Sequence, residues 1–273
     1  VAVLAMGRGG PSEPELIRGD EIELTTEDLL ALAAQGKHAS SDNYEDAVMS
    51  RVVTVGCRRC GGGMAGDTFF SNVPEGARLA DGLGMDLIML EGSGAAIPPV
   101  AADATILVIG AGQGPGYIRD YFGPFRLARA DAVVLTGAEE PVASVTEVET
   151  MLAAIALLRP DLPVACVGFR PAPLEPVAGK RVFFATTAPP ELLPRLTGHL
   201  ESQYGCKVVA ASAHLSNRAL LRADLDAAAG SFDVLLSELK AAAIDVVVAA
   251  GVAAGVHTVL CDNVPVALGG VPV

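Results

Sequence analysis

The most distinctive residues for chemistry are two cysteines and two arginines in a glycine-rich segment. That segment reads Cys57-Arg58-Arg59-Cys60-Gly61-Gly62-Gly63. Structural zinc needs about four ligands, and the sequence has no second closely spaced cysteine pair. A thioredoxin-type pair normally opens a helix, whereas glycines follow here. Adjacent guanidinium groups on such a loop suit a phosphate ester. We therefore favour a phosphate clamp made by Arg58 and Arg59 with Gly61 and Gly62, and a redox pair or a metal site remains an alternative.

A second candidate directly follows the first expected strand, where the sequence reads Met6-Gly7-Arg8-Gly9-Gly10-Pro11. Glycines allow a backbone to approach a ligand closely, and an arginine between them offers a planar set of donors to a phosphate or carboxylate. Parallel sheets bind their ligands at the carboxyl ends of the strands. We therefore predict that Arg8, Gly9 and Gly10 bind substrate, with a plain turn as the alternative.

A third candidate is a carboxylate at the end of an apolar run. Residues 87–90 are Leu-Ile-Met-Leu, and Glu91 and Gly92 follow. In phosphate-loop proteins an acidic residue in this position holds Mg²⁺ directly or through water. We predict that Glu91 is a catalytic residue and a Mg²⁺ ligand, although many strands end in Glu and Gly without any such role.

The glycine-rich loop that normally cradles nucleotide phosphates is not found in this sequence. Its pattern is glycine, four residues, then Gly-Lys-Ser/Thr. The segment Gly179-Lys180 continues with Arg181 and has Leu174 where the first glycine belongs. The residues that bind a nucleotide cofactor are therefore left unassigned.

Other polar residues have simpler interpretations. The acidic stretch at residues 38–46 is typical of a solvated cap for a helix over residues 43–49. His199, His214 and His257 lie far apart in the sequence, and we expect each to be structural.

Short β-branched runs alternate with helical stretches, a pattern typical of parallel α/β units. Strands are expected at residues 1–6, 52–55, 86–90, 104–109, 132–136, 164–167, 181–186, 207–211 and 258–261. Helices are expected at residues 25–35, 145–158, 191–204, 217–229 and 232–252. A connector with three prolines, residues 170–179, precedes a restart of the pattern. We therefore expect two domains, residues 1–179 and a smaller α/β domain at residues 180–273.

Composition narrows the class of protein. The 273 residues carry a formal charge of −13, so the chain has no overall attraction for nucleic acid or anionic membranes. The longest apolar stretch without a charge has 16 residues, 246–261, which is short for a membrane span. Five mostly isolated cysteines argue against a disulfide framework. We expect a cytoplasmic protein with no nucleic-acid or membrane partner, and a homo-oligomer is left open.

Several strings, taken together and in order, resemble the cyclic 2,3-diphosphoglycerate synthetase family. They are AMGRGGPSEPE (5–15), HASSDNYEDA (38–47), TVGCRRCGGGMAG (54–66), SNVPEGARLA (71–80), LEGSGAAIPPVAAD (90–103) and RVFFATTAPPE (181–191). The resemblance implies an enzyme that uses ATP and Mg²⁺ to close 2,3-diphosphoglycerate into a cyclic phosphoanhydride. It also implies that residues 1–179 form a three-layer phosphate-loop NTPase-like domain with a parallel sheet.

The resemblance also includes a departure from the family pattern. In the family, the phosphate loop and its helix precede the strand that corresponds to residues 1–6, so we expect this chain to lack that first strand, the loop and a C-terminal tail. Two alternatives remain open at this stage. One is another phosphate-loop kinase or ATP-dependent ligase for small molecules, and the other is a non-catalytic binding or assembly remnant without the ATP loop.

Overall fold

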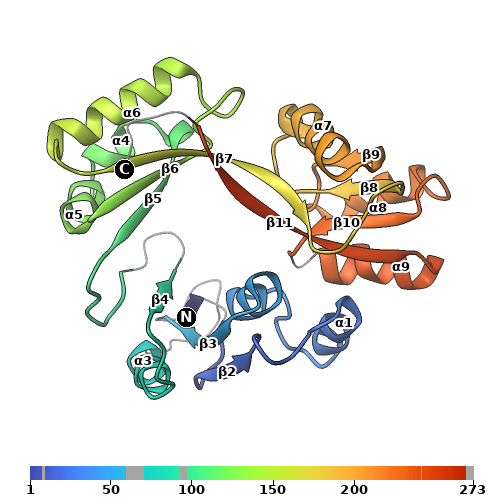
Figure 1. Cartoon of the computed structure of the whole chain (residues 1–273), viewed down its shortest axis with the longest axis horizontal. Helices are drawn as coiled ribbons and strands as arrows, with labels where there is room; N and C mark the ends of the chain where they lie inside the picture. The colour runs from blue at the N-terminus through green and yellow to red at the C-terminus, as the bar shows by residue number, and fades with distance from the viewer. Residues whose placement is uncertain (8–9, 60–70, 93–96, 241, 269–273) are drawn as a thin grey trace. The chain divides into compact units, whose positions relative to one another are not determined.

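The computed structural model describes residues 1–7, 10–59, 71–92, 97–240 and 242–268 of the chain (Figure 1). The chain divides into two compact units, each assembled from three stretches of sequence. Unit one comprises Val1–Ala101, Pro173–Thr187 and Glu201–Asp262, and unit two comprises Ala102–Ala172, Ala188–Leu200 and Asn263–Val273. The units are discontinuous in sequence, so they do not test the expected boundary at residue 179, which stays a prediction.

The first sheet of unit one has the strand order β2-β3-β1-β4. Strands β1 (Ala2–Gly7), β3 (Val53–Arg58) and β4 (Ile88–Glu91) are parallel, and β2 (Glu15–Arg18) is antiparallel to β3. Every residue of β1 is buried, as expected for a continuous apolar run between two parallel neighbours. The register pairs Gly7 with Arg58, and Ala5 with Glu91. The predicted site residues that end these strands therefore share one edge of the sheet.

Helices cover this sheet on both sides. They are α1 (Thr26–Ala34), α2 (Asp42–Glu45), which continues as a π-helical turn η1 (Asp46–Ser50), and α3 (Val73–Asp81). The first begins where the sequence predicts, because the Thr25 hydroxyl accepts from the Asp28 amide and the Asp28 carboxylate accepts from the Thr25 amide.

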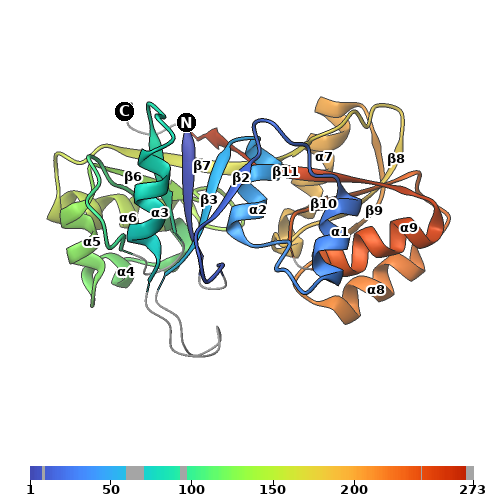
Figure 2. The same ribbon diagram turned by 90° about the horizontal axis from the view of Figure 1, so that it is seen from below.

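A second sheet of unit one has the order β11-β10-β8-β9 with parallel pairs. Its strands are β8 (Arg181–Ala185), β9 (Lys207–Ser212), β10 (Val234–Glu238) and β11 (His257–Ala267), which extends beyond this unit. Helices α8 (Arg218–Ala227), η5 (Ala243–Val248) and α9 (Ala249–Ala254) accompany it. Leu29 of α1 and Val248 of η5 belong to one buried cluster, and α1 lies beside this helical layer (Figure 2). Segments far apart in the sequence thus share a core in unit one.

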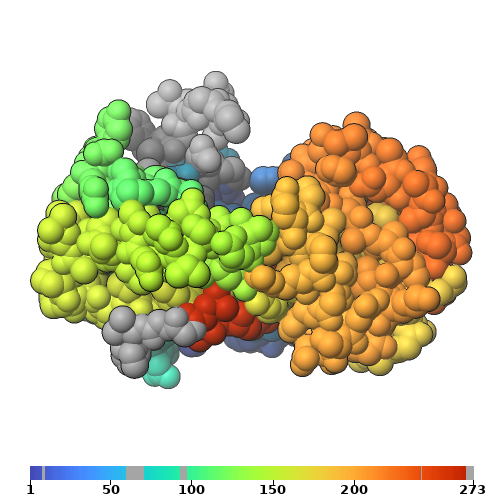
Figure 3. Space-filling model, turned by 90° about the horizontal axis from the view of Figure 1, so that it is seen from above, coloured from blue at the N-terminus to red at the C-terminus, as the bar shows by residue number. Residues whose placement is uncertain are grey.

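Unit two is built on parallel strands in the order β5-β6-β7. These are β5 (Ile106–Gly110), β6 (Ala132–Thr136) and β7 (Val164–Pro173), whose last residue belongs to unit one. The helices are η3 (Ala111–Gln113), α4 (Gly116–Arg119), α5 (Gly123–Arg129), α6 (Val145–Leu158), η4 (Pro190–Leu192) and the first part of α7 (Leu193–Tyr204). Met151 on the inner face of α6 packs with Leu135 and Leu127, while the yellow-green outer face of α6 is visible in Figure 3.

The predicted α/β class with mostly parallel strands is confirmed, and so are helix 145–158 and strand 132–136 at the same bounds. One expectation is wrong: residues 232–252 are not one helix, because Val234–Glu238 is a fully buried strand between β8 and β11. A short apolar run such as Val234-Leu235-Leu236 fits a buried strand and a buried helix equally well, and pairing with neighbours decides between them. Among the described residues, no helix is long and apolar enough to cross a membrane.

Candidate active site

Three chain segments meet at the carboxyl edge of the first sheet, and Asn72 joins them. Its Oδ1 accepts from the Arg58 amide at 2.7 Å, and its Nδ2 donates to the carbonyls of Pro11 and Ser12, each at 3.0 Å. The Asn72 amide also donates to the Arg58 carbonyl at 3.1 Å. Only 7% of Asn72 is exposed, so these bonds form away from competing water. Asn72 thereby holds the loop after β1 against the end of β3.

The backbone after β1 lies in direct contact with β3. A Cβ atom on Gly10 would lie 2.0 Å from the Cys57 carbonyl oxygen, so only glycine fits there. Arg58 completes the contact, because its Nε donates to the Gly10 carbonyl at 2.5 Å. Gly10 and Arg58, both predicted to bind substrate, are therefore neighbours, and part of the Arg58 side chain holds the loop in place.

Two carboxylates lie at this edge with oxygens that lack a partner. Glu91 ends β4, and Asp46 begins η1; the Oε2 of Glu91 and the Oδ2 of Asp46 are buried without a hydrogen bond from any described residue. Burial raises the pKa of Asp46 to about 7, and the charge of Glu91 acts in the same direction. Burial likewise raises the pKa of Glu91 to about 7, with Asp42 contributing. Such oxygens are poorly solvated and would gain from a bound cation.

Two cations moderate this negative charge. Arg59 follows β3, its amide donates to the Gly7 carbonyl at 3.2 Å, and its charge opposes the rise in the pKa of Glu91. Lys240 follows β10 and lies 3.3 Å from a carboxylate oxygen of Glu45. The edge of the first sheet therefore combines acidic and basic groups, the mixture that a phosphate bound with a metal ion requires.

The Cys57 side chain points away from this edge and into the core. A Cβ atom on Gly76 of α3 would lie 2.1 Å from the Cys57 Sγ, so the thiol fills the space that the glycine leaves. Burial raises the pKa of Cys57 to about 11. A neutral, packed thiol is a poor metal ligand and a poor nucleophile, which supports the anion clamp over its redox and metal alternatives.

The structure brings together Gly10, Arg58, Arg59 and Glu91 from the predicted set. Arg8, Gly9, Cys60, Gly61 and Gly62 lie outside the described residues. Asn72 and Lys240 were not predicted as site residues from the sequence. The only local signal for Asn72 was its place before Pro74 at the start of a helix. The acidic residues at 42–46 were expected to be solvated, but burial raises the pKa of both Glu45 and Asp46.

The described residues contain no group of three or more His, Cys, Asp or Glu arranged to hold a metal ion. Mg²⁺ does not need such a cage, since it usually binds one or two carboxylates and takes its other ligands from water and substrate phosphates. The unpartnered oxygens of Glu91 and Asp46 therefore fit a Mg²⁺ ion delivered with a phosphate.

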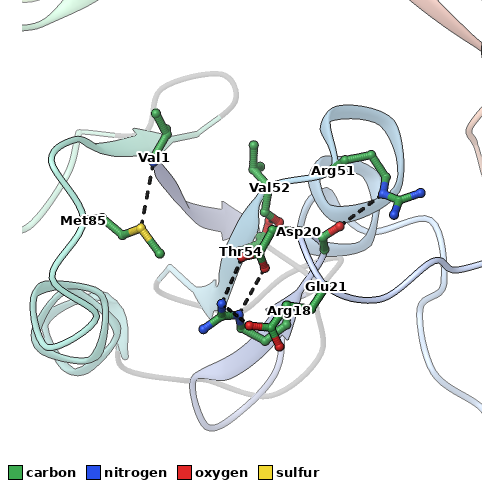
Figure 4. Close-up of polar contacts among 9 residues, drawn as sticks. Val1, Arg18, Asp20, Glu21, Arg51, Val52, Thr54 and Met85 are labelled. Carbon is green, nitrogen blue, oxygen red and sulfur yellow. Dashed lines mark hydrogen bonds and ion pairs between the residues drawn. The ribbon is translucent and has the colours of Figure 1, made fainter.

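The opposite edge of the sheet has a different character. There Arg18 binds Asp20 and Glu21, and Arg51 Nε donates to the Gly19 carbonyl at 3.2 Å (Figure 4). The Arg18 and Asp20 side chains are each 37% exposed, so these are surface contacts of modest energy. They tie the turn after β2 to the sheet and leave no unpaired carboxylate.

Two sequence profiles of one family match the chain. The profile described as "Cyclic 2,3-diphosphoglycerate synthetase, P-loop domain" matches residues 1–167, and that of the synthetase's C-terminal domain matches residues 173–264. The first agrees with the predicted phosphate-loop α/β fold.

Curated proteins named cyclic 2,3-diphosphoglycerate synthetase are similar along nearly the whole chain. The protein of Methanothermus fervidus is 50% identical over 266 residues, covering 97% of this chain and 58% of the relative. That of Rubrobacter xylanophilus is 52% identical over 268 residues, covering 98% of this chain and 60% of the relative. The chain therefore spans about three fifths of the length of these relatives.

Solved structures give a weaker match. The hydrogenase maturation factor HypB of Archaeoglobus fulgidus has 16% identity and a TM-score of 0.34, covering 62% of this chain and 81% of HypB. HypB of Helicobacter pylori, in complex with nickel, has 15% identity and a TM-score of 0.35, covering 61% of this chain and 78% of HypB.

Proposed function

Because the chain belongs to the cyclic 2,3-diphosphoglycerate synthetase family, we propose that it serves the ATP-dependent closure of 2,3-diphosphoglycerate into its cyclic phosphoanhydride. The observation that carries this proposal is the edge of the first sheet, where Arg58 ends β3 and the charge of Arg59 acts on the partly buried carboxylate of Glu91, which in turn acts on Asp46. That combination suits a reaction between phosphate groups.

The reaction balances in two steps. An oxygen of one substrate phosphate attacks the γ-phosphorus of ATP, the bond to the β-phosphate oxygen breaks, and ADP leaves. An oxygen of the second substrate phosphate then attacks the activated phosphorus of the first, and inorganic phosphate leaves as the ring closes. Each step brings anionic groups within bonding distance, so most of the transition-state stabilisation comes from fixed positive donors.

The residues of this chain have separate parts in that scheme. Arg58 and Arg59 bind a substrate phosphate, because a planar guanidinium matches two phosphate oxygens at once. In the sequence-based assignment Arg8 offers its guanidinium to the phosphate, and Gly9, Gly10, Gly61 and Gly62 let the backbone approach the ligand. Asn72 keeps these loops in register, so that the donors are positioned before the substrate arrives.

Glu91 and Asp46 are the residues that would hold Mg²⁺, with Glu91 as the predicted ligand. When bound, the ion neutralises negative charge on phosphate oxygens. With the ion bound, both carboxylates would be ionised, and the charge of the ion would offset the cost of their partial burial. The neighbouring carboxylate of Glu45 already has a cationic partner, because it forms an ion pair with Lys240.

Phosphorus NMR on the full-length protein tests the proposal. With ATP, Mg²⁺ and 2,3-diphosphoglycerate, we expect a cyclic product to form with one ADP and one inorganic phosphate for each ring closed. The Glu91→Gln variant should lose most of this activity, and Glu149→Gln, an exposed carboxylate on α6, should retain it. ATP hydrolysis without cyclic product, or transfer of the phosphoryl group to a different acceptor, would refute the assignment.

The partner implied is a small, highly charged metabolite. We also propose a cytoplasmic location, which the buried thiols of Cys57, Cys166 and Cys206 support, because none of them forms a disulfide with a described residue.

A further inference from the structure

Unit two contains a charged cluster of its own. Arg170 on β7 forms a two-point contact with Glu139, with Nη1 to Oε1 at 2.6 Å and Nη2 to Oε2 at 3.0 Å. Arg195 on α7 places its Nη1 2.6 Å from the same Oε2. Two guanidinium groups thus share one carboxylate, which leaves the cluster with an excess of positive charge in a chain whose net charge is −13.

The fold makes room for this cluster. Glu139 lies in the loop after β6, and a Cβ atom on Gly168 of β7 would lie 2.2 Å from its Oε1. The carboxylate can therefore reach Arg170 only because residue 168 is glycine. The side chains of Glu139 and Arg170 are 17% and 18% exposed, so this pair is a fixed part of the unit.

Arg195 differs from Arg170 in its accessibility and its binding mode. Its side chain is 38% exposed, and it contacts Glu139 through one terminal nitrogen. A guanidinium has five N–H donors, so Arg195 can take an anion from solvent. One turn along the same face of α7 lies His199, whose pKa is lowered by burial and then by the charge of Arg170. Two arginines therefore contact the Glu139 carboxylate, and His199 lies within reach of the charge of Arg170.

We infer that Arg195, with Arg170 behind it and His199 beside it, forms a binding site for a phosphate group of a small phosphorylated ligand. The anion takes Arg195 from Glu139, while Arg170 keeps its two-point contact with that carboxylate. Without a ligand, Glu139 binds Arg195, so its carboxylate competes with the phosphate for that guanidinium. This inference rests on the proposed function only for the identity of the ligand, which would then be 2,3-diphosphoglycerate.

Opposite effects of two substitutions test this site. Calorimetric titration of the full-length protein with 2,3-diphosphoglycerate, without ATP, should show binding weakened about tenfold in Arg195→Gln, because the phosphate loses a charge-assisted hydrogen bond from the guanidinium. Glu139→Gln should bind more tightly than the parent, because the competing charge is gone. Arg218→Gln, which loses an exposed ion pair with Asp245 in unit one, is the matched control and should bind like the parent.

A purely structural ion pair would behave differently. Arg195→Gln and Glu139→Gln would then both lower the melting temperature, and they would not change the affinity for 2,3-diphosphoglycerate in opposite directions. Unchanged affinity in Arg195→Gln, or a loss in Glu139→Gln as large as that in Arg195→Gln, would overturn the inference. Arg195→Lys keeps the positive charge at this exposed position, so its affinity for 2,3-diphosphoglycerate should lie between those of Arg195→Gln and the parent.

A spectroscopic signal gives an independent readout. A bound phosphate should raise the pKa of His199, observed by NMR titration with inorganic phosphate and with 2,3-diphosphoglycerate, and Arg195→Gln should abolish that rise. If neither anion changes the pKa of His199 in the parent protein, the proposed site is contradicted. If the protein binds these anions through Arg195 but forms no cyclic product, the inference stands and the proposed function fails.

Discussion

Glu91 at the end of β4 and Asp46 at the start of η1 are electrostatically coupled: after burial, the charge of Glu91 is the largest cause that raises the pKa of Asp46 to about 7. Each side chain also buries an oxygen without a partner among the described residues. The protein therefore holds unfavourable negative charge at the edge where the phosphate chemistry is proposed, and five predictions concern this edge and the residues that pack beneath it.

The first prediction concerns stability and pH. The ordinary pKa values of Asp46 and Glu91 are 3.8 and 4.5, and both rise to about 7 in the folded protein. The folded state then binds more protons, so this contribution to stability is complete below about pH 4 and is lost as the pH rises through about 7. Asp46→Asn should raise the free energy of unfolding by about 2 kcal/mol at pH 8 in metal-free buffer.

Denaturant titrations at pH 8 and pH 5 check this sign. Near pH 5 the carboxyl is mostly protonated in the folded parent, so the gain from Asp46→Asn should shrink. Equal effects of Asp46→Asn at both pH values would show that the carboxylate carries no such cost.

The second prediction concerns Mg²⁺. Millimolar Mg²⁺ together with 2,3-diphosphoglycerate should raise the melting temperature at pH 8, because binding to the folded state alone stabilises it. Glu91→Gln should remove most of that rise, and the exposed Glu149→Gln should preserve it. A full Mg²⁺-dependent rise in Glu91→Gln would place the ion elsewhere.

The third prediction concerns Asn72. Replacing it with Ala removes three side-chain hydrogen bonds and leaves the carbonyls of Pro11 and Ser12 without their donor. We expect a loss of about 1–3 kcal/mol in stability and a higher KM for the diphosphate, because the loop after β1 is no longer held. Asn217→Ala, which removes the N-cap of α8, should cost about 1 kcal/mol with no change in KM. Equal KM values in both variants would limit Asn72 to a structural role.

The fourth prediction separates the paired arginines. Lysine keeps the charge but loses the planar fork, and at position 58 it also loses the Nε bond to the Gly10 carbonyl. Arg58→Lys should therefore lower the melting temperature and weaken substrate binding, whereas Arg59→Lys should weaken binding with little effect on melting. Substrate dependence equal to that of the parent in both variants would remove the clamp from the proposed site.

The fifth prediction tests the packing of Cys57. Gly76→Ala should destabilise the protein by about 1–3 kcal/mol, because the new methyl group overlaps the Cys57 thiol. Cys57→Ala in the same chain should restore much of that loss by vacating the space. Denaturant titration of the single and double variants measures the coupling, and strictly additive losses would show that the two residues do not touch.

Local patterns in the sequence determined much of this protein. The helix over Val145–Leu158 could be predicted because its capping box, Ser144 with Glu147, and its apolar period are both local. The strand that ends at Glu91 could be predicted from its apolar run and the Gly92 that follows, and Arg58 and Arg59 could be singled out by the glycine-rich segment that contains them.

The tertiary structure alone decided which of these residues meet. Lys240 reaches Glu45 from 195 positions away, Asn72 joins loops separated by about 60 residues, and Glu139 collects arginines from β7 and α7. The strand Val234–Glu238 belongs to this group too, because only its pairing with β8 and β11 distinguishes it from a helix. Such contacts depend on strand order and register, which arise from the burial of many side chains at once and leave no local pattern in the sequence.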